Sequence, residues 1–241
     1  IISGLVGSEM CIRDRFIGGK FLDEKCIKLA GQISSTTGCR IVTDTFVSRI
    51  RRGAGLPKVE QVPYFSEMAE EFLKNTSGVV FLGTNAPVSF FAYPGKKSYL
   101  LSEETEILEL CTPGQDGLSA LKALSDESDA SSINKELIQE KITEYPTKGK
   151  LDSLSIGPLI GALIPEESII SDEAATSSLL VTPHTLGSKP LDWLSLTGGS
   201  IGQGLPLAVG AAIAEPDRPV ITLHGDGAVS YTHLRAHETA D

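Results

Sequence analysis

Residues 16–124 show two alternating patterns of hydrophobic positions. In three stretches the apolar side chains recur every three or four residues, which predicts helices at 22–36, 62–73 and 116–124. Between them lie short runs that are almost continuously apolar, at 38–43, 78–83 and 107–111, which is typical of buried strands. This alternation predicts an α/β domain in which helices cover both faces of a parallel sheet.

The pattern changes at residues 126–132, where small, polar and acidic residues indicate a linker. Beyond it, helical patterns occur near 133–143, 152–163 and 205–214, and apolar strand patterns at 168–171, 193–197 and 219–225. No apolar helix pattern follows residue 228. The predicted fold is therefore two doubly wound, parallel-sheet domains of Rossmann-like type, at 16–125 and 133–228, with the second one truncated.

Charge and composition restrict the partners. The 241 residues carry a net charge of −10 without an extended basic stripe, which argues against nucleic acid, and no apolar stretch is long enough to span a membrane. The basic segment 49–53 (RIRRG) is expected in a loop, where it could contact a phosphate or a carboxylate. The four cysteines are widely spaced, which favours reduced thiols in a cytoplasmic protein.

Three polar or glycine-rich stretches follow predicted strands, at 172–178 (DEAATSS), 198–204 (GGSIGQG) and 225–227 (GDG). Because parallel strands place their carboxyl ends at one edge of a sheet, we expect these stretches to converge there. The hydroxyls of Thr176 and Ser177 could bind phosphate oxygens, or they could cap a helix.

The glycines and the aspartate in these stretches restrict the classes of ligand that could bind there. Gly199, Gly202 and Gly204 follow one another in the reverse order of the dinucleotide fingerprint, which argues against a dinucleotide site. Such dense glycines indicate close approach of either a neighbouring helix or a flat cofactor ring. Asp226 could be half of a Mg²⁺ site, since Mg²⁺ takes few carboxylates beside water and phosphate. A hairpin turn is the alternative, but no second strand follows.

Taken together, DEAATSS and GGSIGQGLPLAVGAAIAEPDRPVITLHGDG resemble the cofactor domain of thiamine diphosphate enzymes of the acetolactate synthase and benzoylformate decarboxylase group. The preceding domain, with TFVSRIRRGAG and PVSFFAYPG, resembles the central domain of the same enzymes. The resemblance implies thiamine diphosphate and Mg²⁺ as cofactors. It also implies a small 2-oxo acid as substrate, and a homodimer or homotetramer as the full-length enzyme.

The resemblance also assigns residues. Asp226 is implied as the metal ligand, and the implied cofactor-binding residues are Thr176, Ser177, Gly199, Ser200, Ile201, Gly225, Asp226 and Gly227. Ile201 is expected beneath the thiamine, and the Gly199 carbonyl is expected to accept from its amino group. Glu173 and His184 are expected near the pocket without an assigned role, with surface or capping duty as the alternative.

Parts of the family's site fall outside this sequence. The resemblance places the activating glutamate in an amino-terminal domain that would precede Phe16, and a further metal-binding asparagine beyond the GDG, so no catalytic residue is assigned and the chain alone is expected to be inactive. Both ends, SGLVGSEMCIRD and VSYTHLRAHET, resemble translated sequencing-adapter strings. Residues 1–15 and 229–241 are therefore expected not to belong to the fold, which excludes His233 and His237 as metal ligands.

The sequence thus predicts a fragment of a thiamine diphosphate- and Mg²⁺-dependent 2-oxo acid decarboxylase or carboligase, similar to acetolactate synthase, which converts pyruvate to acetolactate. One alternative is a benzoylformate-type decarboxylase or another 2-oxo acid lyase. An alternative from another class is a non-catalytic nucleotide-binding or assembly module of doubly wound fold.

Overall fold

The computed structural model describes residues 13–152 and 154–231, which form two compact units. The first unit is built from the chain up to residue 45 and from residues 57–138. The second is built from residues 46–56 and from residue 139 onward, so the chain passes between the units three times. The segment 126–132, expected to be a linker, belongs to the first unit, and the last passage occurs after residue 138.

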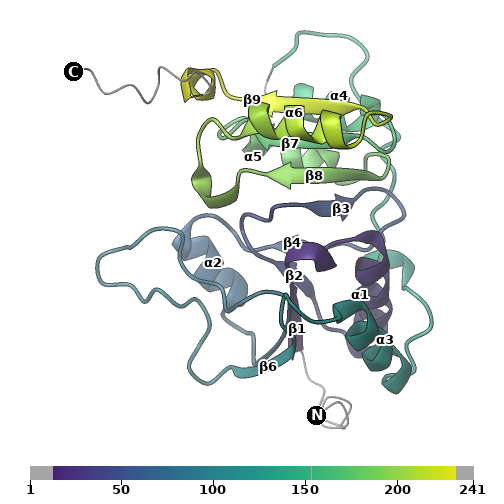
Figure 1. Ribbon diagram of the computed structural model, residues 1–241, viewed down its shortest axis with the longest axis vertical. Helices are drawn as coiled ribbons and strands as arrows, with labels where there is room; N and C mark the ends of the chain where they lie inside the picture. The colour runs from purple at the N-terminus through teal and green to yellow at the C-terminus, as the bar shows by residue number, and fades with distance from the viewer. Residues whose placement is uncertain (1–12, 153, 232–241) are drawn as a thin grey trace. The chain divides into compact units, whose positions relative to one another are not determined.

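A five-stranded parallel sheet forms the centre of the first unit, in the order β4-β2-β1-β5-β6 (Figure 1). Its strands are β1 (Arg13–Ile17), β2 (Ile41–Thr43), β4 (Glu60–Gln61), β5 (Gly78–Leu82) and β6 (Glu106–Cys111). All five residues of β5 are buried, as expected for a strand that is covered on both faces.

The helices of the first unit are α1 (Glu24–Thr37), α2 (Ser66–Leu73) and α3 (Gly117–Glu127), with 3-10 turns η2 (Gly19–Phe21) and η3 (Lys135–Leu137). Helix α2 covers one face of the sheet, and α1 and α3 pack together on the other (Figure 1). Asp23 caps α1 by accepting hydrogen bonds from the amides of Lys25 and Cys26. Apolar residues at helical spacing then fill the core, among them Cys26, Ile27, Ala30 and Ile33.

Strand β1 begins at Arg13, three residues before the domain start expected at Phe16. Its Asp14 is fully buried and is bonded by the guanidinium of Arg40 and the hydroxyl of Thr76. The partners matter because a buried carboxylate without them would be strongly destabilising. The rest of the amino-terminal string expected to be foreign, residues 1–12, is not among the described residues.

The second unit contains a four-stranded sheet in the order β3-β8-β7-β9. Strands β7, β8 and β9 are parallel, and β3 runs antiparallel to β8. The strands are β3 (Ile50–Arg52), β7 (Ile169–Glu173), β8 (Leu191–Ser195) and β9 (Val220–His224). The helices are α4 (Ile156–Leu163), α5 (Ser178–Val181) and α6 (Gly204–Ala214), with 3-10 turns η4 (Thr182–Thr185), η5 (Thr197–Gly199) and η6 (Gly227–Tyr231). The expected α/β class is confirmed.

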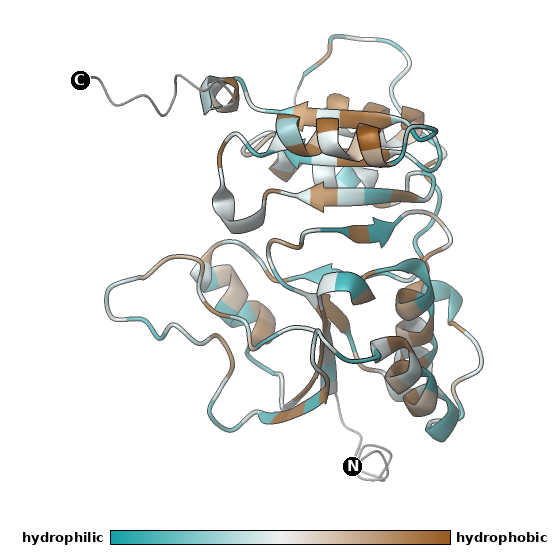
Figure 2. Cartoon of the chain, in the orientation of Figure 1, coloured by the Kyte–Doolittle hydropathy of each residue, from teal (hydrophilic) through white to brown (hydrophobic). Residues whose placement is uncertain are grey.

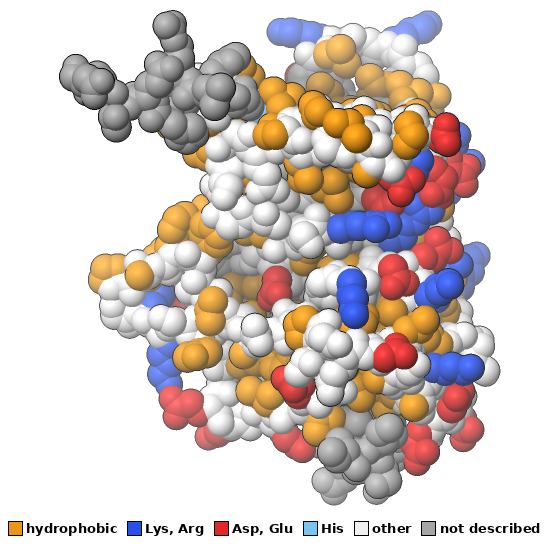
Figure 3. Space-filling model, viewed as in Figure 1, with side chains coloured by type: hydrophobic (Ala, Val, Ile, Leu, Met, Phe, Trp, Pro, Cys, Tyr) orange, Lys and Arg blue, Asp and Glu red, His pale blue; other side chains and the backbone are white. Residues whose placement is uncertain are grey.

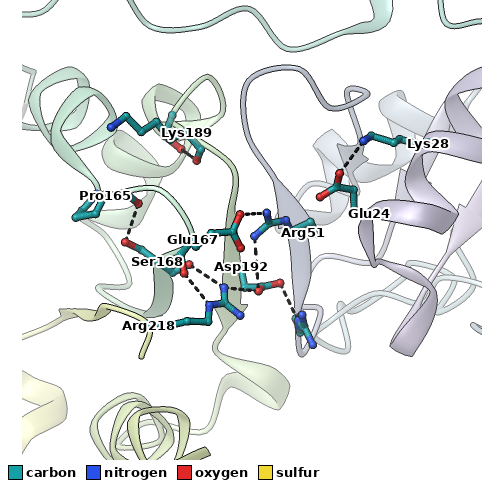
Figure 4. A network of polar contacts seen from close by, with 11 residues as sticks. Glu24, Lys28, Arg51, Pro165, Glu167, Ser168, Lys189, Asp192 and Arg218 are labelled. Atoms are coloured by element: carbon teal, nitrogen blue, oxygen red, sulfur yellow. Dashed lines mark hydrogen bonds and ion pairs between the residues drawn. The ribbon is translucent and has the colours of Figure 1, made fainter. Parts of the chain in front are cut away.

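The segment 49–53 is not the loop that the sequence predicted, because residues 50–52 form strand β3. Two of its arginines, Arg49 and Arg51, bind carboxylates of the same unit. The buried Asp192 on β8 accepts from Arg49 at 2.8 Å and from Arg218 at 2.6 Å, and Arg51 pairs with Glu167 (Figure 4). The guanidinium of Arg52 lies 3.6 Å from the ring centroid of Trp193. Polar contacts therefore hold this edge strand.

The prediction of a helix near 133–143 is also wrong. Only the three-residue turn η3 forms there, because the following backbone makes tertiary hydrogen bonds instead. The amide of Gln139 donates to the Leu56 carbonyl at 2.9 Å, and the amide of Ile142 donates to the Gly187 carbonyl at 2.9 Å. These bonds replace those that a helix would make within the segment.

Apolar residues cover much of α6 in the second unit (Figure 2). Hydrophobic side chains gather on the surface over this helix (Figure 3), where Val209 is 60% and Ile213 is 76% exposed. Among the described residues, none of the helices combines the length and the apolar character that crossing a bilayer requires.

Candidate functional site

The three stretches singled out in the sequence meet at one edge of the second unit's sheet. Strands β8, β7 and β9 are neighbours and run in parallel. In their registers Ser195 lies opposite Asp172, and His224 lies opposite Glu173. The loops that follow the three strands therefore start side by side, at the carboxyl edge where α/β sheets place their ligands.

The loop after β7 presents two free hydroxyl groups. Thr176 and Ser177 are exposed, and neither side chain has a hydrogen-bond partner within the described part of the chain. Ala175 has a φ of +45°, a conformation that non-glycine residues rarely adopt. Asp172 accepts from the hydroxyls of Ser178 and Thr182 just beyond the loop. The loop is thus anchored on both sides while its hydroxyls stay available.

The glycine-rich loop between β8 and α6 has three left-handed glycines, with φ of +63° at Gly198, +65° at Gly199 and +94° at Gly202. A side chain on Gly202 would meet the backbone oxygen of Tyr231 at 2.9 Å. This glycine is therefore required by the approach of η6, and the left-handed conformation accounts for the other two. Ile201, at the tip, is 56% exposed.

Asp226 is exposed in the turn after β9 and has no hydrogen-bond or ion-pair partner among the described residues. The neighbouring glycines leave space: of the atoms that the structure describes, a Cβ on Gly227 would meet none within 4 Å, and one on Gly225 would meet only the Glu173 carbonyl at 3.5 Å. The described residues hold no group of three metal-ligating side chains. One or two carboxylates are the usual protein share of a Mg²⁺ site that water and phosphate complete, so Asp226 supplies at least part of such a site.

These donors fit a bound Mg²⁺ diphosphate. Asp226 supplies a carboxylate for the metal, and the hydroxyls of Thr176 and Ser177 can donate to phosphate oxygens. The exposed apolar side chain of Ile201 offers a surface for a flat ring. Gly199 and Ser200 lie in the same glycine-rich loop, and Gly225 and Gly227 leave room around the carboxylate. All eight residues implied by the sequence therefore lie in the loops and 3-10 turns that follow the strands at one sheet edge.

The two residues without an assigned role differ in the structure. Glu173 is only 3% exposed and accepts hydrogen bonds from the amides of Gly202 and Gly204, so it caps the first turn of α6 from a neighbouring strand. His184 is exposed and packs against α4, where a Cβ on Gly157 would meet its ring at 2.9 Å.

His224, at the end of β9, was missed by sequence reasoning. Its side chain is 11% exposed, its Nδ1 lies 3.5 Å from Glu173 Oε2, and neither ring nitrogen has a hydrogen-bond partner among the described residues. The only sequence signal was its position directly before the GDG turn.

A family of cofactor-binding domains matches the part of the chain that contains the candidate site. Residues 175–240 match the family described as "Thiamine pyrophosphate enzyme, C-terminal TPP binding domain". The matched range contains every implied cofactor residue, and it continues into residues 229–240, which had been expected to be foreign. Residues 232–241 are beyond the described part of the chain.

Several curated proteins with similar sequences carry the name acetolactate synthase. The chain is 42% identical over 216 residues to "Putative acetolactate synthase large subunit IlvX" of Mycobacterium tuberculosis, which covers 90% of this chain and 41% of that protein. It is 30% identical over 132 residues to acetolactate synthase 1, chloroplastic, of Zea mays, covering 50% of this chain and 20% of that protein. The chain thus spans about two fifths or less of these relatives.

A solved structure supports the fold. The thiamine diphosphate-dependent 4-hydroxybenzoylformate decarboxylase of Rhodococcus jostii RHA1 superposes with a TM-score of 0.73 at 20% sequence identity. The match covers 95% of this chain and 46% of that protein. Both units of this chain therefore have the α/β folds found in that protein.

Proposed function

Because this chain belongs to the thiamine diphosphate-dependent enzymes, we propose that the protein carrying it is a Mg²⁺-dependent 2-oxo acid decarboxylase or carboligase similar to acetolactate synthase. In this proposal the second unit is the front part of the cofactor-binding domain, and the first unit is the central domain. The observation that carries the proposal is the meeting of Thr176, Ile201 and Asp226 at one carboxyl edge of a parallel sheet.

Each residue of the site has a proposed task. Asp226 binds the metal ion, and Thr176 and Ser177 bind the diphosphate through their hydroxyls. Ile201 supports the thiamine ring from the glycine-rich loop. Bound thiamine diphosphate supplies the carbon nucleophile and the electron sink for loss of carbon dioxide from a 2-oxo acid. The residues of this chain bind and orient it, and the group that activates the ring is proposed to come from a domain outside this sequence.

Cofactor binding to a full-length protein that carries this chain tests the site. We expect thiamine diphosphate to bind only weakly without Mg²⁺ and tightly with it, as measured by isothermal titration calorimetry. Asp226→Ala should weaken binding in Mg²⁺ at least about tenfold, because it removes a charged metal ligand.

The matched control is Asp217→Ala, which removes another exposed aspartate, located before β9 at the opposite end of the strand. This variant should bind the cofactor as the unmodified protein does. Equal binding by the Asp226→Ala and Asp217→Ala variants would exclude Asp226 as the metal ligand.

Product analysis decides between the two related reactions. Incubation with pyruvate should give acetolactate, which requires a second carbonyl compound to be joined after loss of carbon dioxide. Benzoylformate should be a poor substrate. Benzaldehyde from benzoylformate, without acetolactate from pyruvate, would assign the protein to the benzoylformate-type decarboxylases. Tight cofactor binding without any product from either acid would favour a non-catalytic module.

The proposal includes a homodimer or homotetramer in the cytoplasm. The thiols of Cys26 and Cys111 are buried in the first unit, as is usual for cysteines that stay reduced. Burial raises the pKa of the Cys26 thiol to about 12, which keeps it protonated and unreactive at neutral pH. Light scattering of the full-length protein would give the oligomeric state.

A further inference from the structure

Glu173 is a buried carboxylate whose hydrogen bonds all go to the backbone of the site loops. Oε1 accepts from the amide of Gly202, and Oε2 accepts from the amide of Gly204 at 2.5 Å. No lysine or arginine within the described residues forms an ion pair with this carboxylate. The groups next to its charge are therefore two backbone N–H groups, the amino-terminal end of α6 and the ring of His224, whose Nδ1 lies 3.5 Å from Oε2.

The same residue holds the other two loops through its backbone. Its carbonyl accepts from the amide of Gly225 at 3.2 Å, in the turn that carries Asp226. Along the chain it leads directly into the loop with Thr176 and Ser177. One residue thus contacts or continues into all three loops of the proposed site.

We propose that Glu173 is a positioning residue that fixes these three loops relative to one another, and thereby sets the affinity for thiamine diphosphate. The inference rests on the proposed function of the site. Glu173 itself need not touch the cofactor, because its carboxylate is turned toward the amides of Gly202 and Gly204 beneath the loop. Its Oε1 accepts the hydrogen bond from the Gly202 amide, and this amide belongs to the loop that carries Gly199, Ser200 and Ile201.

The close fit leaves little freedom for this carboxylate. A Cβ on Gly204 would meet Glu173 Cβ and Oε2, each at 2.8 Å. The side chain is therefore packed against the backbone that it binds. A glutamine of the same size would fit the space, but its NH₂ group would face an N–H donor. One of the two amides would then lose its acceptor, and a buried donor without a partner is costly.

The first test compares cofactor affinity in the full-length protein. Glu173→Gln should raise the dissociation constant of thiamine diphosphate in Mg²⁺ at least about tenfold, measured by calorimetry on protein that circular dichroism shows to be folded. The apparent KM for the cofactor should rise in parallel, whereas kcat at saturating cofactor should stay within about twofold. A purely structural role would lower the Tm and leave the affinity of the folded protein unchanged.

The control is Glu215→Gln, which makes the same chemical change at an exposed glutamate that ends α6. It should leave the dissociation constant unchanged. An unchanged affinity in folded Glu173→Gln protein would overturn the positioning role, while the proposed function would stand.

A second measurement needs no variant and no cofactor. In the unmodified protein without ligand, the amides of Gly202 and Gly204 should exchange hydrogen at least about tenfold more slowly than that of Ile201 at the tip of the loop. Equal exchange rates would contradict the proposal even if the glutamine variant does not fold. If the unmodified protein fails to bind thiamine diphosphate at all, the proposed function fails, and the exchange experiment still decides whether Glu173 holds the loop.

Discussion

At the scale of single residues, the sequence cannot separate a glycine that the conformation of the site requires from a glycine that merely lies in the neighbouring helix α6. Gly202 is required by its left-handed φ and by the nearby backbone of η6. Gly210 lies within α6, where a Cβ would meet none of the described atoms within 4 Å outside the helix's own backbone. Both are glycines in the same apolar stretch of sequence. Their substitution should therefore have opposite effects on stability.

Gly202→Ala should lower the free energy of unfolding by about 1–3 kcal/mol, because the new side chain would be strained and would approach Tyr231 Cβ at 2.8 Å. Gly210→Ala should raise it by about 0.8 kcal/mol, since alanine favours a helix. Urea denaturation of the two variants gives both values. A Gly202→Ala variant as stable as the unmodified protein would contradict both the left-handed φ at this position and the packing of η6 against this loop.

At the scale of elements, ion pairs help to hold strand β3, in addition to the burial of Ile50. Asp192 is 2% exposed on the adjacent strand and binds Arg49 and Arg218. Burial would raise the pKa of this carboxyl, but the hydrogen bonds from the two arginines outweigh burial and hold the pKa below its ordinary value. The ionised form therefore stabilises the folded second unit.

We expect Asp192→Asn to lower the free energy of unfolding of the second unit by about 3 kcal/mol, because it leaves arginines around a neutral group. Asp217→Asn, at an exposed position, should change it by less than about 0.5 kcal/mol. Denaturation followed by Trp193 fluorescence measures both, since this tryptophan lies on β8.

The carboxylate of Asp192 should make the free energy of unfolding depend on pH. A folded pKa below the unfolded value of about 3.9 means that the contribution is complete above that pH and is lost as the pH falls through the folded pKa. The unfolding free energy of the unmodified protein should therefore fall below about pH 4 more steeply than that of Asp192→Asn. Identical slopes would mean that Asp192 keeps no ion pairs in solution.

At the scale of the whole molecule, all the implied cofactor residues belong to the second unit. A ligand that binds the folded state stabilises it by mass action, by about 2.7 kcal/mol at one hundred times its dissociation constant. Thiamine diphosphate with Mg²⁺ should therefore slow hydrogen exchange in β7 and β9 of the full-length protein. The amides of β1 and β5 in the first unit serve as the internal control and should change little. Equal protection of both units would contradict a site confined to the second.

Much of the fold and the site could be predicted from the pattern of residues. The spacing of apolar residues predicted the helices α1, α2, α3 and α6, and the apolar run before the GDG predicted strand β9, because these signals are local. The predictions near 49–53 and 133–143 were wrong because distant segments pair with the backbone there. Strand β8 pairs with β3, with Trp193 opposite Ile50, and the Leu56 carbonyl accepts from the amide of Gln139. No local pattern can show such pairing.

By itself, the sequence determined the α/β class, the three polar stretches that follow strands, and the resemblance to thiamine diphosphate enzymes. Only the tertiary structure decided that β3 joins the second unit, that Gly202 faces η6, and that Glu173 ties three loops together. The physical reason is that side-chain periodicity reports which face of an element is buried, whereas a buried carboxylate is stabilised by whichever donors the folded chain brings to it.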